Sequence, residues 1–260
     1  MAIQNMRLSD AFILDVAAGN IAGMSFDRKF GSIDSIQAAT PADVWEYGTT
    51  SGAELYTFSA DGVADIDTMS GSNAGDTVPM TIEGLADDGT LVTQTKNLTG
   101  QTKVTLDTPL WRVNRAFNSD GSPLAGDVYI YVDGAITAGV PDVATDVRAF
   151  VSTGNEQTLQ TIYTVPAGKT AYFMGLESSL TKGTGSTQVS ANLKGKTRAF
   201  GKQFRTQDEF NLLSHGSSTK NINFPIPIPF PEKTDFCPNV DVSSNGLGVS
   251  WAFTVLLVDN

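Results

Sequence analysis

The chain has 260 residues and a formal net charge of −11, from 28 acidic and 17 basic side chains. Charged residues make up only 17% of it, against a usual ~25%, and glycine, at 25 residues, exceeds the usual ~7%. This composition excludes a charge-rich disordered chain, and an acidic surface argues against broad nucleic-acid binding. The length suits one large β domain or two smaller ones.

The acidic excess lies entirely in the first part of the chain. Residues 1–145 contain 19 acidic and 7 basic residues (net −12), whereas residues 146–260 contain 9 and 10 (net +1), which together give −11. This split suggests two modules that face different surroundings.

Cysteine content and hydropathy indicate where the protein is made. A single cysteine, Cys237, rules out an internal disulfide framework and suits a reducing cytoplasm. The apolar run Ala11–Leu14 is cut by Asp15, so the N-terminus does not resemble a signal peptide. No uncharged apolar run approaches the ~20 residues of a membrane helix. We therefore expect a protein that does not bind membranes and is assembled in the cytoplasm.

Residues 1–30 show no clear strand alternation and are predicted to form an N-terminal arm. Ser9 or Asp10 could cap a short helix that runs through Val16. The arm either docks on a neighbouring subunit or lies on its own domain. In the first case Arg7, Phe12 and Ile13 are the candidate contact residues.

Residues 31–142 are predicted to form a first β domain, because short apolar runs alternate with turn clusters about every ten residues. Asp87-Asp88-Gly89 is a strong hairpin signal. The pattern is typical of a sandwich or barrel, and the domain border is expected within Ala135–Asn155. The predicted strands are Val44–Tyr47, Glu54–Ser59, Ala64–Met69, Val78–Ile82, Leu91–Leu98, Lys103–Leu106, Trp111–Phe117 and Asp127–Val132.

Residues 143–260 are predicted to form a second, jelly-roll-like β domain. Thr161–Val165 and Thr170–Met174 are joined by Pro166-Ala167-Gly168-Lys169 and suggest a hairpin. Its expected partner is the uncharged, alternating stretch Gly248–Val258. Further strands are predicted at Val189–Leu193, Thr197–Phe204 and Ile222–Phe230, with a polar loop around Leu213–Lys220. The alternate prolines of Phe224–Phe230 indicate an edge strand or a polyproline-like crossing.

Few residues could support catalysis or metal binding. His215 is the only histidine, so a zinc site or a histidine-based triad has too few partners. Cys237 is expected to be a small buried apolar group. The carboxylate pairs Asp65/Asp67 and Asp208/Glu209 lack a full calcium-loop pattern and are interpreted as solvated faces. We expect no enzyme activity, no metal and no cofactor.

Two surface interpretations remain open. Lys194, Lys196 and Arg198 point to one face of a predicted strand. They could dock on an acidic protein surface or form a solubilising, edge-protecting row. A second set of residues, expected in the core, could alternatively form a sugar-binding platform: Trp45, Tyr47, Tyr56 and Trp111.

Seven short motifs, in a fixed order, resemble those of a family of structural proteins from tailed-bacteriophage virions. The resemblance covers most of the chain from about Phe30 onward. The motifs are Val44–Gly48, Phe58–Gly62, Thr81–Leu85, Leu98–Gly100, Trp111–Ala116, Tyr163–Thr170 and Phe230–Asp235.

The resemblance implies a virion component, most like a head decoration (cement) protein that binds the major capsid protein and stabilises contacts between its subunits. It implies no catalytic residues. Such a protein would be a homo-oligomer, with a trimer favoured, on the capsid surface. The alternative is a receptor- or glycan-binding fibre or tail protein. A polysaccharide hydrolase would need two exposed carboxylates in a groove.

Overall fold

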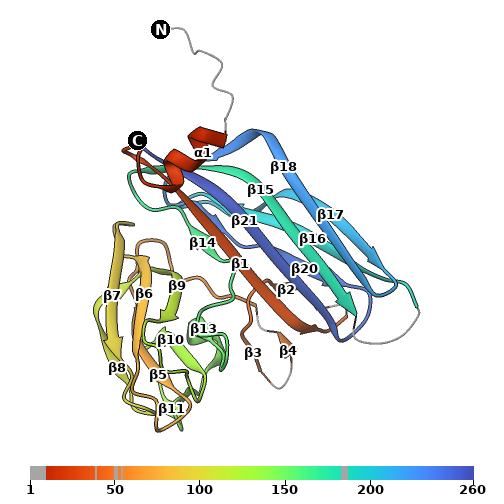
Figure 1. Ribbon diagram of the computed structural model, residues 1–260. Helices are drawn as coiled ribbons and strands as arrows, with labels where there is room; N and C mark the ends of the chain where they lie inside the picture. The colour runs from red at the N-terminus through yellow and green to blue at the C-terminus, as the bar shows by residue number, and fades with distance from the viewer. Residues whose placement is uncertain (1–9, 39, 50–51, 54, 183–186) are drawn as a thin grey trace.

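The computed structural model describes residues 10–260 except 39, 50–51, 54 and 183–186. Among these residues one α-helix, α1 (Asp10–Ala17), and one short 3-10 helix, η1 (Ala144–Asp146), accompany 21 strands. The predictions of an all-β fold and of a short helix near Asp10 are confirmed (Figure 1).

Eight strands form a jelly roll. One sheet has the order β1-β21-β15-β18, and the facing sheet has the order β2-β20-β16-β17. This interleaving of early and late strands in two facing sheets is the double Greek key of a jelly roll. Short strands β14 (Tyr163–Thr164) and β19 (Asp235–Phe236) extend the second sheet. The eight strands are β1 (Met24–Ile36), β2 (Ala42–Asp43), β15 (Lys169–Lys182), β16 (Val189–Arg198), β17 (Arg205–Ser214), β18 (Ser217–Phe230), β20 (Asn239–Val242) and β21 (Leu247–Asp259).

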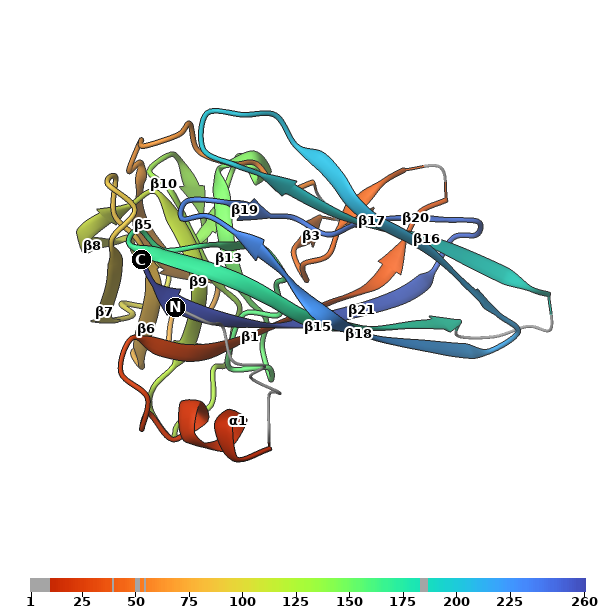
Figure 2. The ribbon, with the colours of Figure 1, turned by 90° about the horizontal axis from the view of Figure 1, so that it is seen from above.

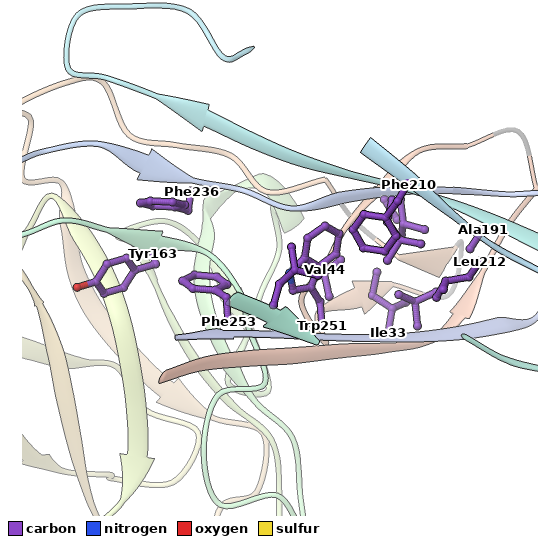
Figure 3. Packing of buried hydrophobic residues seen from close by; sticks show 14 of the residues in the cluster. Ile33, Val44, Tyr163, Ala191, Phe210, Leu212, Phe236, Trp251 and Phe253 are labelled. Atoms are coloured by element: carbon purple, nitrogen blue, oxygen red, sulfur yellow. The ribbon is translucent and has the colours of Figure 1, made fainter. Parts of the chain in front are cut away.

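The jelly-roll core lies between these two sheets. In β21, buried and partly exposed residues alternate, which points Trp251 and Phe253 inward and Ser250 and Ala252 outward. Figure 3 shows these inward rings facing residues of the second sheet, including Phe210. Strand β21 pairs with β15 along its length, as the sequence predicted.

A second sandwich, the inserted sandwich, lies in the chain between β2 and β14. Its sheets have the orders β13-β10-β5-β8 and β7-β6-β9. Residues such as Met69, Ile82 and Ile130 from both sheets form its core. Strands β6 and β7 pair across Asp87-Asp88-Gly89, which confirms that hairpin. The strands are β5 (Ile66–Gly71), β6 (Pro79–Leu85), β7 (Leu91–Asn97), β8 (Val104–Leu110), β9 (Arg112–Asn118), β10 (Val128–Val132) and β13 (Val147–Val151).

Two small ribbons complete the β-structure. Strands β3 (Gly48–Thr49) and β4 (Gly52–Ala53) pair near the point where the chain leaves the jelly roll. Strands β11 (Ile136–Thr137) and β12 (Val140–Pro141) form a hairpin at one end of the inserted sandwich.

Strand pairing does not follow the predicted domain borders at residues 30 and 142. Strand β1 starts inside the predicted arm and pairs with β21, and β13 pairs with β10 across the second border. Alternation in β1 is hidden because its inward positions include Lys29 and Gly31. A Cβ on Gly31 would lie 2.8 Å from the backbone nitrogen of Thr161, so only glycine fits there.

Several local predictions also need correction. Thr161–Val165 and Thr170–Met174 do not pair with each other: β14 pairs with β19, and β15 with β18 and β21. The Pro166–Lys169 turn therefore carries the chain from one sheet to the other. The predicted strands at Val44–Tyr47 and Glu54–Ser59 are not strands, Glu54 itself lying outside the described residues.

In the second half of the chain, the predicted strand Thr197–Phe204 turns away after Arg198. The predicted polar loop Leu213–Lys220 instead covers the end of β17, a tight turn at His215 and Gly216, and the start of β18. The alternate prolines lie in β18 at the edge of its sheet, so the edge interpretation is confirmed.

Candidate functional site

A buried charge cluster joins the two sandwiches. Arg112, at the start of β9, reaches into the jelly roll and binds Asp235 of β19 through two parallel hydrogen bonds. Its Nε lies 3.0 Å from Oδ1 and its Nη2 3.1 Å from Oδ2. The two side chains are 1% and 2% exposed. A bidentate pair fixes both the distance and the angle between its carriers, so this contact orients one sandwich on the other.

A second arginine completes the cluster. Arg198, at the end of β16, donates to Asp235 Oδ2 over 3.0 and 2.5 Å. It also donates to Asp61 Oδ1 over 3.0 Å, and Arg112 lies 3.4 Å from the same oxygen. Two guanidinium groups thus share two carboxylates, and the four formal charges cancel. Thr164 of β14 adds a hydrogen bond of 2.5 Å to Asp235. The cancellation and the added hydrogen bond offset the cost of burial.

Aromatic rings enclose this cluster. The Phe58 ring lies 5.0 Å from the Arg112 guanidinium carbon and 5.2 Å from that of Arg198. Trp111 contacts Arg112 at 4.2 Å, and Phe204 contacts Arg198 at 5.0 Å. These distances lie within the range of cation–π attraction.

The aromatic residues weighed as a sugar-binding platform are buried. They are between 0 and 7% exposed, so the expectation that they belong to the core is confirmed: Trp45, Tyr47, Tyr56 and Trp111. The first three form part of the aromatic core beside the junction.

Neutral hydrogen bonds extend the junction beyond the charges. The side-chain amide of Asn114 donates to the carbonyl oxygen of Thr164 over 3.0 Å and accepts from its N–H over 2.9 Å. Gln160 donates to the carbonyl oxygen of Val113 over 2.9 Å. These hydrogen bonds link β9 to β14 and to the chain segment that leads into β14.

Lys29 is another buried charge at the junction. It is 5% exposed, and its ammonium group donates to the carbonyl oxygen of Asn114. Burial above all, with a contribution from Arg115, lowers the pKa of Lys29 to about 8 against the opposing effects of Asp27 and Glu83. The same groups line a cavity of about 170 Å³ between β1 and the inserted sandwich.

The junction is suited to holding the two sandwiches together rather than to acid–base chemistry. Its two carboxylates are paired with arginines; Asp235 is 2% exposed and Asp61 19% exposed. Cys237 is buried, as predicted, and burial raises the pKa of its thiol, which suppresses its reactivity. His215 is exposed in the turn between β17 and β18. Among the described residues, no group of three or more His, Cys, Asp or Glu side chains could hold a metal ion.

The predicted partner contacts fall in two separate places. Arg7 lies outside the described residues. Phe12, partly buried, and Ile13, 39% exposed, lie on α1. No helix in the described part of the chain is long and apolar enough to cross a membrane.

The predicted basic row lies on β16, which has neighbours on both sides. It therefore does not protect a sheet edge. Arg198 belongs to the junction, and Lys194 forms an ion pair of 2.9 Å with Asp241. Lys196 lines a groove along the open edge of the jelly roll.

This edge groove, about 220 Å³ in volume, lies between the two sheets beside β17 and β18. Aromatic residues of both sheets form its floor, and polar residues of β16 and β17 border it. The lining includes Phe173, Phe224, Ile228, Lys196, Gln207 and Asp208. Ile228 is 37% exposed, so the groove opens to solvent at β18.

Comparison with known proteins does not assign the chain to a family. No family model and no curated protein matches the chain. The structure of the infectious bursal disease virus Gx strain is 10% identical, with 90% of this chain and 75% of that chain covered and a TM-score of 0.21. The VP2 subviral particle of infectious bursal disease virus is also 10% identical, with 95% and 77% covered and a TM-score of 0.18. Scores this low support no conclusion about this chain.

Of the junction charges, only Arg198 was a candidate from the sequence, and for another role, docking on an acidic protein surface. Arg112 and Asp235 are 123 positions apart, and neither belongs to a recognisable catalytic or metal motif. One signal was present: each lies within a motif that carries the phage-protein resemblance.

Proposed function

We propose that this chain is a non-enzymatic structural protein of a tailed-phage virion. It binds the head surface and stabilises contacts between major capsid subunits as a decoration (cement) protein. In this proposal its location is the capsid surface, after assembly in the host cytoplasm, and its own copies associate, with a trimer favoured.

One observation supports the proposal most. Five of the seven motifs that carry the resemblance meet at the junction of the two sandwiches. They supply Trp45, Asp61, Arg112, Thr164 and Asp235, and the last four are linked by hydrogen bonds or ion pairs. Residues that meet in space only after folding specify a whole architecture. The resemblance therefore concerns the two-sandwich scaffold rather than one local turn.

The alternative, a receptor- or glycan-binding fibre or tail protein, has weaker support. Jelly rolls occur in lectins as well as in capsids, so the fold does not decide. A glycan platform needs exposed aromatic faces, and the four aromatic side chains considered for that role are buried.

The decisive measurement is the number and position of copies on the particle. Cryo-microscopy of virions that contain this chain, combined with quantitative mass spectrometry, compares its copy number with that of the major capsid protein. We expect copies at symmetric positions over the head lattice, in a fixed ratio to capsid subunits. A few copies confined to the tail or fibres would overturn the proposal in favour of the alternative.

A binding assay adds an independent test. Purified protein should sediment with heads that lack it and should raise the temperature at which those heads open. Heads that gain no stability when every site is filled would contradict a cement role.

A further inference from the structure

Two apolar features of this chain lie apart, and neither covers the other. On α1, Ile13 and Leu14 are 39% and 68% exposed. At the edge groove, Ile228 is 37% exposed, and nearby Ile226 is 83% exposed. We propose that α1 of one copy docks in the edge groove of a second copy, so that copies associate head to tail.

The helix cannot fill the groove of its own copy. It contacts β1, and its Val16 is only 2% exposed within the same copy. Strands β1 and β18 form opposite edges of one sheet, with β21 and β15 between them. At ~4.8 Å per strand spacing these edges are roughly 14 Å apart. Figure 2 shows α1 outside this sheet, away from β17 and β18.

The volumes of the two features agree. The groove encloses about 220 Å³. A cavity of roughly 150 Å³ holds one benzene molecule, which has six carbon atoms. In proportion, this groove has room for about eight or nine carbon atoms. The side chains of Ile13 and Leu14 have four carbons each. Insertion of both would fill the groove and cover the partly exposed Phe224 and Ile228 of its lining.

The charges of the two features are complementary. The sequence of α1 has two aspartates, Asp10 and Asp15, and no basic residue. Lys196 lines the groove, and Lys202 and Arg205 lie in the adjoining turn and at the start of β17. These three cations form no ion pair with another described residue. The lining itself holds one cation, Lys196, and one carboxylate, Asp208, and Lys202 and Arg205 are two further cations of the adjoining segment. A basic rim would steer an acidic helix toward the groove.

A contact of this kind is heterologous, since two different surfaces of the chain meet. Repetition closes a ring when the rotation between copies allows it and otherwise extends into a filament. This inference deepens the proposed function, because it names the contact between copies of a head-surface protein. Its test uses purified protein alone, so it can fail while head binding stands.

The first test is cross-linking between two populations of the full chain. One carries Leu14→Cys and the other Ile228→Cys; the native Cys237 is buried and does not interfere. Under mild oxidation the mixture should form a disulfide-linked heterodimer. Mass spectrometry should then identify a cross-linked peptide pair that contains the two introduced cysteines. Leu91→Cys replaces Ile228→Cys in the matched control, because Leu91 is 58% exposed on the inserted sandwich. A heterodimer that forms no faster than in the control would overturn the proposal.

The second test reverses charges. Asp15→Lys should weaken self-association about tenfold in sedimentation velocity, and Lys196→Glu should do the same. The double variant should recover most of the loss, because the pair is restored with opposite sign. A lysine in the last turn of a helix favours helix formation, so weaker association of Asp15→Lys would not reflect a melted helix. A chain that is monomeric at every concentration, or single variants that associate normally, would overturn the proposal.

Discussion

The two sandwiches differ in how far along the sequence their strands find partners. In the inserted sandwich, β6 and β7 pair across one tight turn, from Leu85 opposite Leu91 outward. In the jelly roll, β1 pairs with β21, and Met24 lies opposite Val258. Non-local pairing must first overcome the entropy of closing a long loop, so the jelly roll depends on segments from both ends of the chain. The inserted sandwich is continuous in sequence and does not.

The largest expected effect follows from this difference. Ending the chain at Asn245 removes β21, the strand between β1 and β15. We expect the jelly roll to unfold, while the inserted sandwich keeps its own core. Limited proteolysis with mass spectrometry should then show a protected fragment close to residues 58–158. Deletion of Asp259 and Asn260 alone is the control. Protection of β16 to β20 in the shortened chain would show that β21 is peripheral.

The same contrast explains which parts of the fold the sequence predicted. Asp87-Asp88-Gly89 and the alternating β21 carry their signal in neighbouring residues, and both predictions were confirmed. Strand β1 was missed because Lys29 and Gly31 occupy inward positions for reasons that lie in distant residues. The contact between Arg112 and Asp235 was not predicted for the same reason. Arg112 and Asp235 come together only in the folded chain, and the local periodicity of the sequence does not predict contacts between residues so far apart.

The next effect concerns the link between the two sandwiches. Asp235→Asn removes the shared carboxylate charge and leaves Arg112 almost fully buried beside Asp61 alone. Breaking one partner of a buried pair costs about 3–5 kcal/mol, because the other charge stays desolvated. Urea unfolding should show this loss, and the transitions of the two sandwiches should separate. Asp107→Asn, at an exposed ion pair with Lys96, is the control. A wild-type midpoint for Asp235→Asn would contradict this account of the junction.

Lys29 should make the junction sensitive to alkaline pH. Its pKa is about 8 in the folded chain against an ordinary 10.5. Between these values the unfolded chain keeps a proton that the folded chain has lost, so the free energy of unfolding rises with pH. Below pH 8 the full cost of burying the charge applies, about 3 kcal/mol for this difference in pKa. Wild type should therefore gain stability relative to Lys29→Gln between pH 8 and 10.5 in urea titrations. Parallel curves would show that Lys29 titrates normally.

The smallest effect tests whether burial, rather than the presence of an ion pair, decides stability. Arg28 on β1 and Glu177 on β15 form an ion pair of 2.9 Å across β21, so it also links distant segments. Their side chains are 55% and 52% exposed, and water and salt screen the attraction. Glu177→Gln should thus cost at most about 1 kcal/mol, and less when the salt concentration is raised. Urea midpoints at low and high salt measure both quantities. A loss of stability as large as that of Asp235→Asn, and unchanged by salt, would contradict this expectation. It would show that the presence of an ion pair, rather than its burial, decides the loss.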